Sequence, residues 1–444
     1  MSPGRPVPEP PADPPERPPE GPRGHAGSLF RHRDFLLLWC GQTVSQTGSQ
    51  VTIVALPLVA IVLLKASTFQ VGLLATATNS AFLLISLPAG LLADRVGKRR
   101  LMLGCDLALV AIIGSVPAAQ AAGALTLGQL YLVALVSSAC GAVFLVAYTS
   151  YLPGLIGPGQ LLDGNSKLST TQSAAQVTGP GLGALLVGLL GPARALIGDA
   201  VSYALSVATL LLIRRAEPAP SDTRRPGPAQ VRLPLRAQLG QGLGYVLREP
   251  VLRRAAGWNG TANFFVIMVE TLGPVFLVRT VHLRPAYVGV LLALGAVGGV
   301  AGGLVSGPLI RRIGSARLSW LSITVFTLPG LLIPLARPGW LALLFAVGWV
   351  SWTFGSTLCS IVLVSYQQAT CPSLLRGRVS AALRWINWGT LPLGALAAGA
   401  LGSAVGVHAV LWLAVIGGCS SGLWLLLSPL RGMRDLALDG VQPA

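Results

Sequence analysis

Long uncharged apolar runs alternate with short charged segments along most of the chain. A helix rises about 1.5 Å per residue, so about 20 apolar residues cross the roughly 30 Å hydrocarbon core of a bilayer. The pattern predicts an all-α polytopic membrane protein with 12 transmembrane helices in two six-helix halves. The first six runs are 35–64, 66–93, 101–122, 125–152, 166–190 and 193–213, and the second six are 255–278, 286–310, 318–336, 340–366, 379–405 and 408–427.

Three segments outside these runs divide the chain. Residues 1–28 hold ten Pro among charged residues and are predicted to be a disordered tail. The halves are then 29–213 and 255–430, with a central loop at 214–254 and a second tail at 431–444. In the central loop Leu235, Leu239, Leu243 and Leu247 recur every four residues. This spacing favours an amphipathic helix on the anionic inner leaflet, although the loop's glycines also fit a plain tether.

The composition excludes an ordinary soluble enzyme. Only 11% of the residues are charged and 52% are apolar, whereas soluble domains carry about 25% charged residues. The net charge of +17 comes from short basic clusters without interleaved aromatics, so nucleic acid is not a predicted partner. The four His and the six scattered Cys show no metal-ligand spacing, so neither a metal nor another cofactor is expected.

The distribution of Lys and Arg predicts the orientation. With the N-terminus inside, the basic residues on outer loops are only Lys65, Arg194, Arg279, Arg284 and Arg337, out of 32 in the chain. Cytoplasmic loops carry the excess of positive charge in membrane proteins. A multi-pass protein of the cell membrane with both termini in the cytoplasm is therefore expected.

An internal repeat relates the two halves. The loop Gly90–Arg100 after the second run has a counterpart in 307–317 after the eighth run. A Leu-Gly-Ala-Leu sequence occurs in the fifth run at 182–185 and in the eleventh at 393–396. Duplicated six-helix halves in parallel are a transporter architecture, and the repeat predicts that the halves are pseudo-symmetric.

The first of these loops resembles the signature of the major facilitator superfamily, Gly-x-Leu-x-Asp-Arg-x-Gly followed by basic residues. Gly179, Pro180 and Gly183 in the fifth run resemble the Gly-Pro motif of its proton-coupled antiporter branch. Stretches 39–58, 148–155 and 376–379 are similar to exporters of macrolides and siderophores. The basic motif that many drug antiporters carry in the fourth span is absent from 135–142. The resemblance covers residues 29 to 430 and implies alternating access, proton coupling and function as a monomer.

The resemblance also implies an inner gate. In the superfamily the signature Asp, here Asp94, latches the inner side shut against the eleventh span. Arg311 stands where the second loop would have its Asp, so that loop cannot make the same contact. Orientation by positive charge alone is the plainer role for such loops. The gate residues are Gly90, Asp94, Arg95, Gly97, Arg99, Arg100, Arg311 and Arg312.

Three acids within the runs are candidates for proton coupling. Glu270 lies far from any loop, and an ionisable group inside a membrane is costly and usually functional. Its alternative role is a structural acid hydrogen-bonded between helices. Asp199 is either a second proton site or the ion-pair partner of Arg194. Asp106 is either a proton site or part of an inner-gate salt bridge with nearby Arg99 and Arg100.

Polar and aromatic stripes suggest a substrate cavity, because the resemblance implies that spans one, four, seven and ten surround it. The first span carries three glutamines spaced by four residues, and exposing their amides to lipid would cost free energy, so they are expected to face a polar cavity. Aromatic stripes, in contrast, are more often packing than pocket. The candidate cavity residues are Gln42, Gln46, Gln50, Phe144, Tyr148, Asn259, Asn263, Trp349, Trp352 and Ser356.

Glycines spaced by four predict a moving seam between the halves. The eighth run carries Gly295, Gly299, Gly303 and Gly307, and small residues at this spacing let helix backbones approach closely. Across the halves these glycines would meet Gly179 and Gly183 of the fifth run. The same glycines would equally well allow static packing of helices within one half.

The function expected from the sequence is export of a small amphipathic organic compound, such as a drug, siderophore or secondary metabolite, by proton antiport. Uptake by a proton symporter or a facilitator would share the fold. A non-transporting sensor is less favoured, because Glu270 would have no role. An enzyme is not expected, since no cluster of His, Asp or Cys lies near one membrane face. The expected partners are the small-molecule substrate, protons and the lipid bilayer.

Overall fold

The computed structural model describes residues 29, 32–214, 235–372 and 375–436, without the side chains of 81–84, 86–95, 158 and 235–239. The predicted tail 1–28 therefore lies outside the described residues, as does part of the central loop. All regular elements in the described part are helices, and ten of them are long and apolar enough to cross a membrane. The chain is an all-α, multi-pass membrane protein, as the hydropathy pattern predicts.

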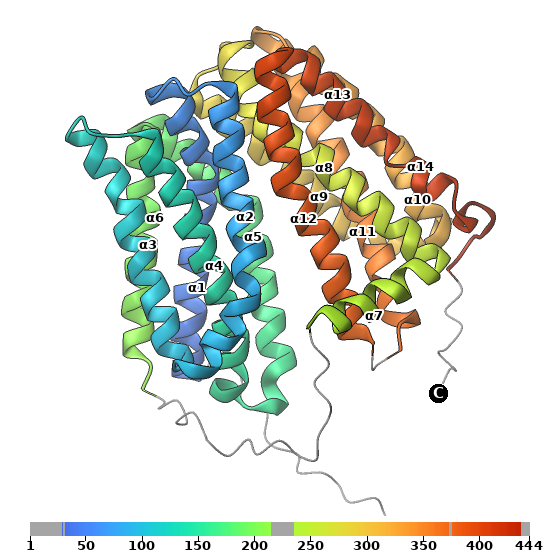
Figure 1. Ribbon diagram of the computed structural model, residues 1–444, viewed down its shortest axis with the longest axis horizontal. Coiled ribbons are helices and arrows are strands. Elements are labelled where there is room, and N and C mark those ends of the chain that lie inside the picture. Colours follow the sequence, from blue (N-terminus) through green and yellow to red (C-terminus); the bar gives the residue numbers. More distant parts are fainter. Residues whose placement is uncertain (1–28, 30–31, 215–234, 373–374, 437–444) are drawn as a thin grey trace, which may run out of the picture.

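The helices α1 to α6 lie together on one side of the molecule (Figure 1). Glycines with positive φ, Gly157 and Gly191, end α4 and α5, as is common at helix C-termini. A short π-helical stretch, Val59–Leu63, extends α1. The helices are α1 (Arg33–Leu58), α2 (Thr68–Arg95), α3 (Lys98–Ala121), α4 (Leu127–Ile156), α5 (Leu161–Leu190) and α6 (Pro192–Leu212).

The remaining helices form the other side of the molecule in Figure 1, with α7 across one end. Shorter 3-10 segments, Leu328–Leu335, Gly339–Ala342 and Pro429–Gly432, adjoin some of them. The helices are α7 (Leu235–Arg248), α8 (Pro250–Arg279), α9 (Pro285–Ile313), α10 (Ser315–Phe326), α11 (Leu343–Thr370), α12 (Arg376–Ala404), α13 (Val407–Ser420) and α14 (Leu423–Leu426).

Prolines explain where the elements differ from the hydropathy runs. The ninth run is α-helical only to Phe326, because Pro329 and Pro334 cannot donate backbone hydrogen bonds and a 3-10 segment follows. The helix α8 begins five residues before the predicted run starts at residue 255. There Pro250 occupies the first turn, and the Glu249 carboxylate accepts a hydrogen bond from the backbone N–H of Leu252.

The two groups of helices meet where α2 packs against α12 and α5 packs against α9. A Cβ on Gly72 would lie 2.4 Å from the Cα of Gly399, so the two backbones touch there. Gly289 likewise faces Ala184. These contacts lie near the start of α2 and the end of α12, which is the end of the molecule remote from α7 (Figure 1). We call the two ends the remote end and the α7 end.

The glycines of α9 pack differently from the predicted seam. Gly295 and Gly298 lie against α11, since their Cβ positions would meet Trp349 and Val350. Gly303 has no atom within 4 Å of its Cβ position, and Gly299 meets only the Thr357 hydroxyl at 3.5 Å. In this structure Gly295 and Gly298 therefore pack within their own group of helices, whereas the positions of Gly299 and Gly303 are open.

Candidate substrate cavity

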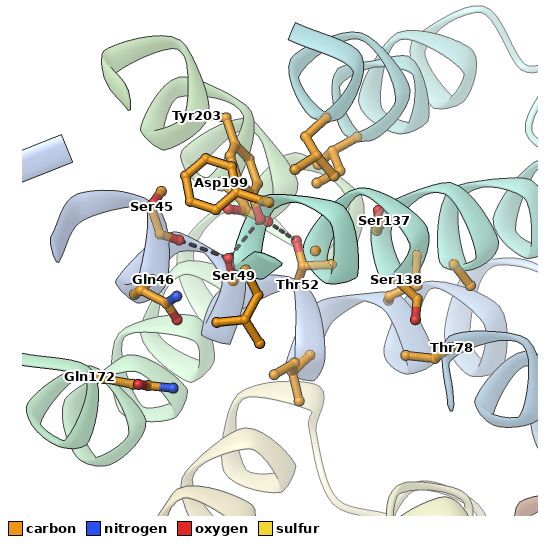
Figure 2. Close-up of a pocket in the computed structure, with 18 of the residues that line it drawn as sticks. Ser45, Gln46, Ser49, Thr52, Thr78, Ser137, Ser138, Gln172, Asp199 and Tyr203 are labelled. Atoms are coloured by element: carbon orange, nitrogen blue, oxygen red, sulfur yellow. Dashed lines mark hydrogen bonds between the residues drawn. The ribbon is translucent and has the colours of Figure 1, made fainter. Parts of the chain in front are cut away.

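A cavity of about 630 Å³ lies among α1 to α6 and is bounded on its other side by α8. Hydroxyl and amide side chains alternate on its wall with aliphatic ones such as Ile53, Leu74 and Leu109. No Lys, Arg or His is present among its described lining residues. Figure 2 shows part of this wall, with Ser45, Gln46, Ser49 and Thr52 of α1 beside Asp199 and Tyr203 of α6. Such a mixed wall suits a ligand with both polar and apolar surface.

Four of the predicted substrate residues line this cavity: Gln42, Gln46, Phe144 and Tyr148. The rings of Phe144 and Tyr148 stack, with centroids 6.3 Å apart. They come from α4, and the two glutamines come from α1. The cavity thus brings together the aromatic and amide candidates of the first six helices.

Several predicted residues lie elsewhere. Gln50 is not among the lining residues, because its side chain packs at the Cβ position of Gly179 on α5. Trp349 and Trp352 are buried in the second group, where they fill the space beside Gly295 and Gly418. Ser356 is half-buried on α11 and lines neither of the two cavities described. The tryptophan stripe is therefore core packing, the alternative that the sequence left open.

Asn259 lines a second, smaller cavity of about 270 Å³ among α8, α11 and α12. Its wall includes Arg384, Gln367 and Asn387. Asn263 does not line it and instead donates a hydrogen bond of 2.8 Å to the backbone oxygen of Asn259. Because Glu270 faces the first cavity, α8 contributes to both cavities at different levels.

The three predicted acids all line the first cavity. Glu270 projects from α8, and its side chain is exposed there. It has no hydrogen bond or ion pair among the residues that the structure describes. The structure therefore does not show Glu270 as a structural acid that is hydrogen-bonded between helices, which was the alternative role considered from the sequence.

Asp199 is fully buried on α6 and is held by hydroxyl groups. It accepts a hydrogen bond from Thr52 of α1 and another, of 3.1 Å, from Ser202. Arg194 is exposed near the start of α6 and forms no ion pair with Asp199. The ion-pair interpretation of Asp199 is therefore wrong, and hydroxyl donors take the place of the predicted cation.

Asp106 is 1% exposed on α3 and accepts a hydrogen bond of 2.7 Å from Ser206 of α6. Arg99 instead donates to the backbone oxygens of Leu210 and Leu211, each at 3.0 Å. A cation at the last carbonyls of a helix is favoured by the helix dipole, so Arg99 stabilises the end of α6. Arg100 is exposed. The predicted salt bridge with Asp106 is not formed.

The sequence reasoning missed the hydroxyl groups that hold these acids. Asp199, Ser202, Tyr203 and Ser206 are spaced by three, four and seven residues and share one face of α6. This spacing was visible in the sequence as a polar stripe on an otherwise apolar helix. Their partners Ser49 and Thr52 continue the polar face of α1 beyond its glutamines.

The predicted gate residues are only partly described. The surroundings of Gly90 and the side chains of Asp94 and Arg95 lie outside the described set, so the inner latch stays a prediction. Gly97 precedes the first turn of α3, and Arg311 and Arg312 are exposed in the last turn of α9. In the antiporter motif, Gly183 packs against the backbone of Val51, and Pro180 lies inside α5.

A polar cavity within a bundle of membrane-length helices is an arrangement that suits the transport of a small molecule. Residues 38–389 match the family model of the Major Facilitator Superfamily. The chain belongs to that family.

Two of the relatives that the chain resembles are named as exporters. The multidrug efflux pump Tap of Mycolicibacterium fortuitum is 26% identical over 84% of this chain and 90% of its own length. The enterobactin exporter EntS of Citrobacter koseri is also 26% identical, over 84% of this chain and 86% of its own. Among solved structures, the nucleoside transporter NupG superposes with a TM-score of 0.68 at 13% identity, covering 89% of this chain and 98% of its own. That likeness concerns the fold alone.

Proposed function

We propose that this protein exports a small amphipathic organic compound in exchange for protons by alternating access. The relatives named as a multidrug efflux pump and an enterobactin exporter support the direction of transport. The mixed polar and aliphatic wall of the first cavity supports an amphipathic substrate. Because a single chain encloses this cavity, the monomer is the proposed functional unit.

The proposed architecture has twelve membrane helices in two halves, α1–α6 and α8–α14, where α13 and α14 together form one span. This count includes α2 and α12, which pack on each other between the two groups. The proposed domain bounds remain 29–213 and 255–430, with α7 in the cytoplasmic segment 214–254. Exposed arginines at the α7 end, such as Arg248, Arg311 and Arg376, support a cytoplasmic location for that end and for both termini.

The charges around the cavity narrow the class of substrate. Three carboxyl groups face it, and no base is present among its described lining residues. An anionic ligand would meet repulsion there, whereas a cation or an uncharged hydrogen-bond donor would not. We therefore propose cationic or neutral amphiphiles, with Gln42, Gln46 and Tyr148 as hydrogen-bonding groups.

The single observation that carries proton coupling is the position of Glu270. An exposed acid without a described partner, on α8 and facing the polar wall of α1 to α6, is free to exchange a proton with the cavity. Substrate and proton would then occupy one cavity in alternation.

The first prediction concerns this acid. In proteoliposomes with an imposed pH gradient, Glu270→Gln should abolish gradient-driven transport of a panel of fluorescent cationic and neutral amphiphiles. Their binding to the purified protein should persist, because glutamine keeps the size and hydrogen-bonding atoms of glutamate while losing the titratable proton.

Asp163→Asn is the matched control, because Asp163 is a half-exposed acid engaged with Lys167 at 2.7 Å and lies outside the cavity. It should transport like the wild type. Undiminished transport by the Gln variant would remove Glu270 as the proton carrier. If the substrate moved across the membrane in the same direction as the protons, and not in the opposite direction, the mechanism would be uptake by proton symport.

A further inference from the structure

The helices α1 and α6 approach so closely that their polar side chains interlock beside the first cavity. A Cβ on Gly48 would lie 2.1 Å from the Ser202 hydroxyl oxygen and 2.6 Å from a carboxyl oxygen of Asp199. Only glycine leaves room for this approach at position 48. The approach brings the hydroxyl groups of the next turn of α1 within reach of α6.

Two hydrogen bonds then join the helices (Figure 2). Thr52 donates to one carboxyl oxygen of Asp199, and the Ser49 and Tyr203 hydroxyls lie 2.7 Å apart. The Ser49 hydroxyl also donates to the backbone oxygen of Ser45 at 2.8 Å. A serine hydroxyl has one proton, so Tyr203 is the donor to Ser49.

The same stretch of α1 presents Gln42, Ser45 and Gln46 to the cavity. One helix therefore carries both the groups bonded to the acid and the groups available to a substrate. A change in how α1 is held to α6 must alter the position of its cavity-facing side chains.

The surroundings of Asp199 contain few charges. From α3 comes Asp106, which accepts a hydrogen bond from Ser206, two turns after Asp199 on α6. Next to Asp106, Cys105 of α3 lies beside Cys140 of α4. Tyr203 on α6 itself lies near both Asp199 and Asp106. The helix α5 contributes the apolar Leu186 beside Gly198.

The bases of the neighbouring segments lie away from this acid. Arg99 binds the last carbonyls of α6, and Arg194 is exposed near the first turn. No cation compensates Asp199 among its described contacts. Its two hydroxyl donors, Thr52 and Ser202, are therefore its described stabilising partners.

We propose that Asp199 is a proton-binding site and that Thr52 and Ser49 are positioning residues which transmit its protonation state to α1. This inference rests on the proposed proton antiport. A hydrogen bond to an ionised carboxylate is roughly twice as strong as one between neutral groups. Proton binding to Asp199 therefore weakens the bond from Thr52 and loosens α1 from α6. Proton and substrate then compete through the position of one helix.

The test needs no substrate and uses the purified full-length protein in lipid vesicles. A nitroxide label is attached at Gln46→Cys after the six native cysteines are replaced by alanine. Its mobility is followed between mildly acidic and mildly alkaline buffer. The proposal expects the ratio of the mobile, loosened population to the ordered one to grow about fivefold on acidification, as the loss of roughly 1 kcal/mol of bonding between α1 and α6 would produce.

Variants separate proton binding from its transmission. Asp199→Asn should abolish the pH dependence and keep the label in its low-pH state. Thr52→Val should diminish the response, and the conservative Thr52→Ser should restore it. Asp163→Asn, the acid paired with Lys167, should leave the response unchanged.

Infrared pH-difference spectra of the same samples report the proton itself. A carboxyl band that titrates in the wild type should vanish in Asp199→Asn and persist, with a shifted frequency, in Thr52→Val. A full pH response of the label in Asp199→Asn, or a wild-type set of carboxyl bands in that variant, overturns the inference. Transport by the wild type that ignores a pH gradient would overturn the proposed antiport instead, which distinguishes the two failures.

Discussion

At the scale of single residues, available space decides which side chains α1 and α6 can carry. A Cβ added at Gly41 would lie 2.2 Å from the Thr209 hydroxyl. A Cβ added at Gly48, two turns later, would meet Ser202 and Asp199. Helices in a membrane gain little from the hydrophobic effect when they associate, so close backbone packing and polar contacts hold them together. In α1 and α6 the glycines allow the close backbone packing, and the hydroxyl groups make the polar contacts.

Gly48→Ala should therefore destabilise the protein by about 1–3 kcal/mol, the usual effect of overpacking a close contact. Thermal unfolding of the purified protein in detergent measures the loss. Gly104→Ala on α3 is the control, because its Cβ position meets no atom within 4 Å and alanine is the better helix former. If both variants unfold at the same temperature, the close approach of α1 and α6 is wrong.

At the scale of elements, α9 has two different faces. A Cβ added at Gly298 would lie 2.1 Å from the backbone oxygen of Val350, so this face packs directly against the backbone of α11. Gly303, five residues later, has open space at its Cβ position. Residues on the open face are available for contacts in another state of the transport cycle.

The predicted role of Gly303 in a moving seam is tested by comparing the two faces. Gly303→Leu should leave folding and thermal stability nearly unchanged yet slow transport, because the added bulk would obstruct closure of the α7 end. Gly298→Leu should lower the unfolding temperature instead, since its space is already filled. Normal transport by Gly303→Leu, measured in proteoliposomes, would remove the open face of α9 from the moving contact.

The C-terminal segment completes the second loop of the internal repeat. Asp435 accepts a hydrogen bond of 2.9 Å from the backbone N–H of Ser315, at the start of α10. The backbone oxygen of Arg434 accepts another from Ala316 at 3.1 Å. An acid near a helix N-terminus is favoured by the free N–H groups and the dipole. Asp435 thus caps the start of α10.

At the scale of the whole molecule, the described contacts between the two groups of helices concentrate at the remote end. Gly72 and Gly399 touch there, Gly188 meets Ala286, and the guanidinium of Arg279 donates to the backbone oxygen of Ala66. Separating the groups at this end requires these contacts to break together. We therefore expect the remote end to act as a closed barrier on that side of the first cavity.

Gly399→Ala should open this barrier more often. The added methyl group would lie 2.8 Å from the Cα of Gly72, and a backbone contact of this kind cannot adjust cheaply. A cost of about 1–3 kcal/mol in the closed arrangement would raise the open-to-closed ratio roughly 5-fold to 150-fold. Distances between spin labels on α2 and α12 at the remote end would report the shift.

Gly389→Ala, on the same helix but with no atom within 4 Å of its Cβ position, is the control and should keep the wild-type distances. Identical distance distributions in the two variants would contradict the assignment of the Gly72–Gly399 contact as a barrier.

The hydropathy of the chain determined by itself that this is an all-helical membrane protein and where its helices run. Membrane insertion depends on the local composition of about 20 residues, which needs no knowledge of distant contacts. The signature loop and the glycine-proline motif determined the superfamily. Glu270, Asp199 and Asp106 could be found in advance for a similar reason, since an acid within an apolar run is conspicuous wherever it points.

The tertiary structure decided which of the candidate side chains share a cavity. Gln42, Gln46 and Gln50 look equivalent in the sequence, but each step of four residues turns about 40° around a helix of 3.6 residues per turn. By Gln50 this drift has carried the side chain away from the cavity and onto Gly179 of α5. The tryptophans of α11 turned inward to fill space beside glycines, and hydroxyls of α1 and α6 replaced the cations expected beside the buried acids. Hydropathy is a property of one segment, whereas rotation about a helix axis is determined only by the neighbouring helices against which the segment packs.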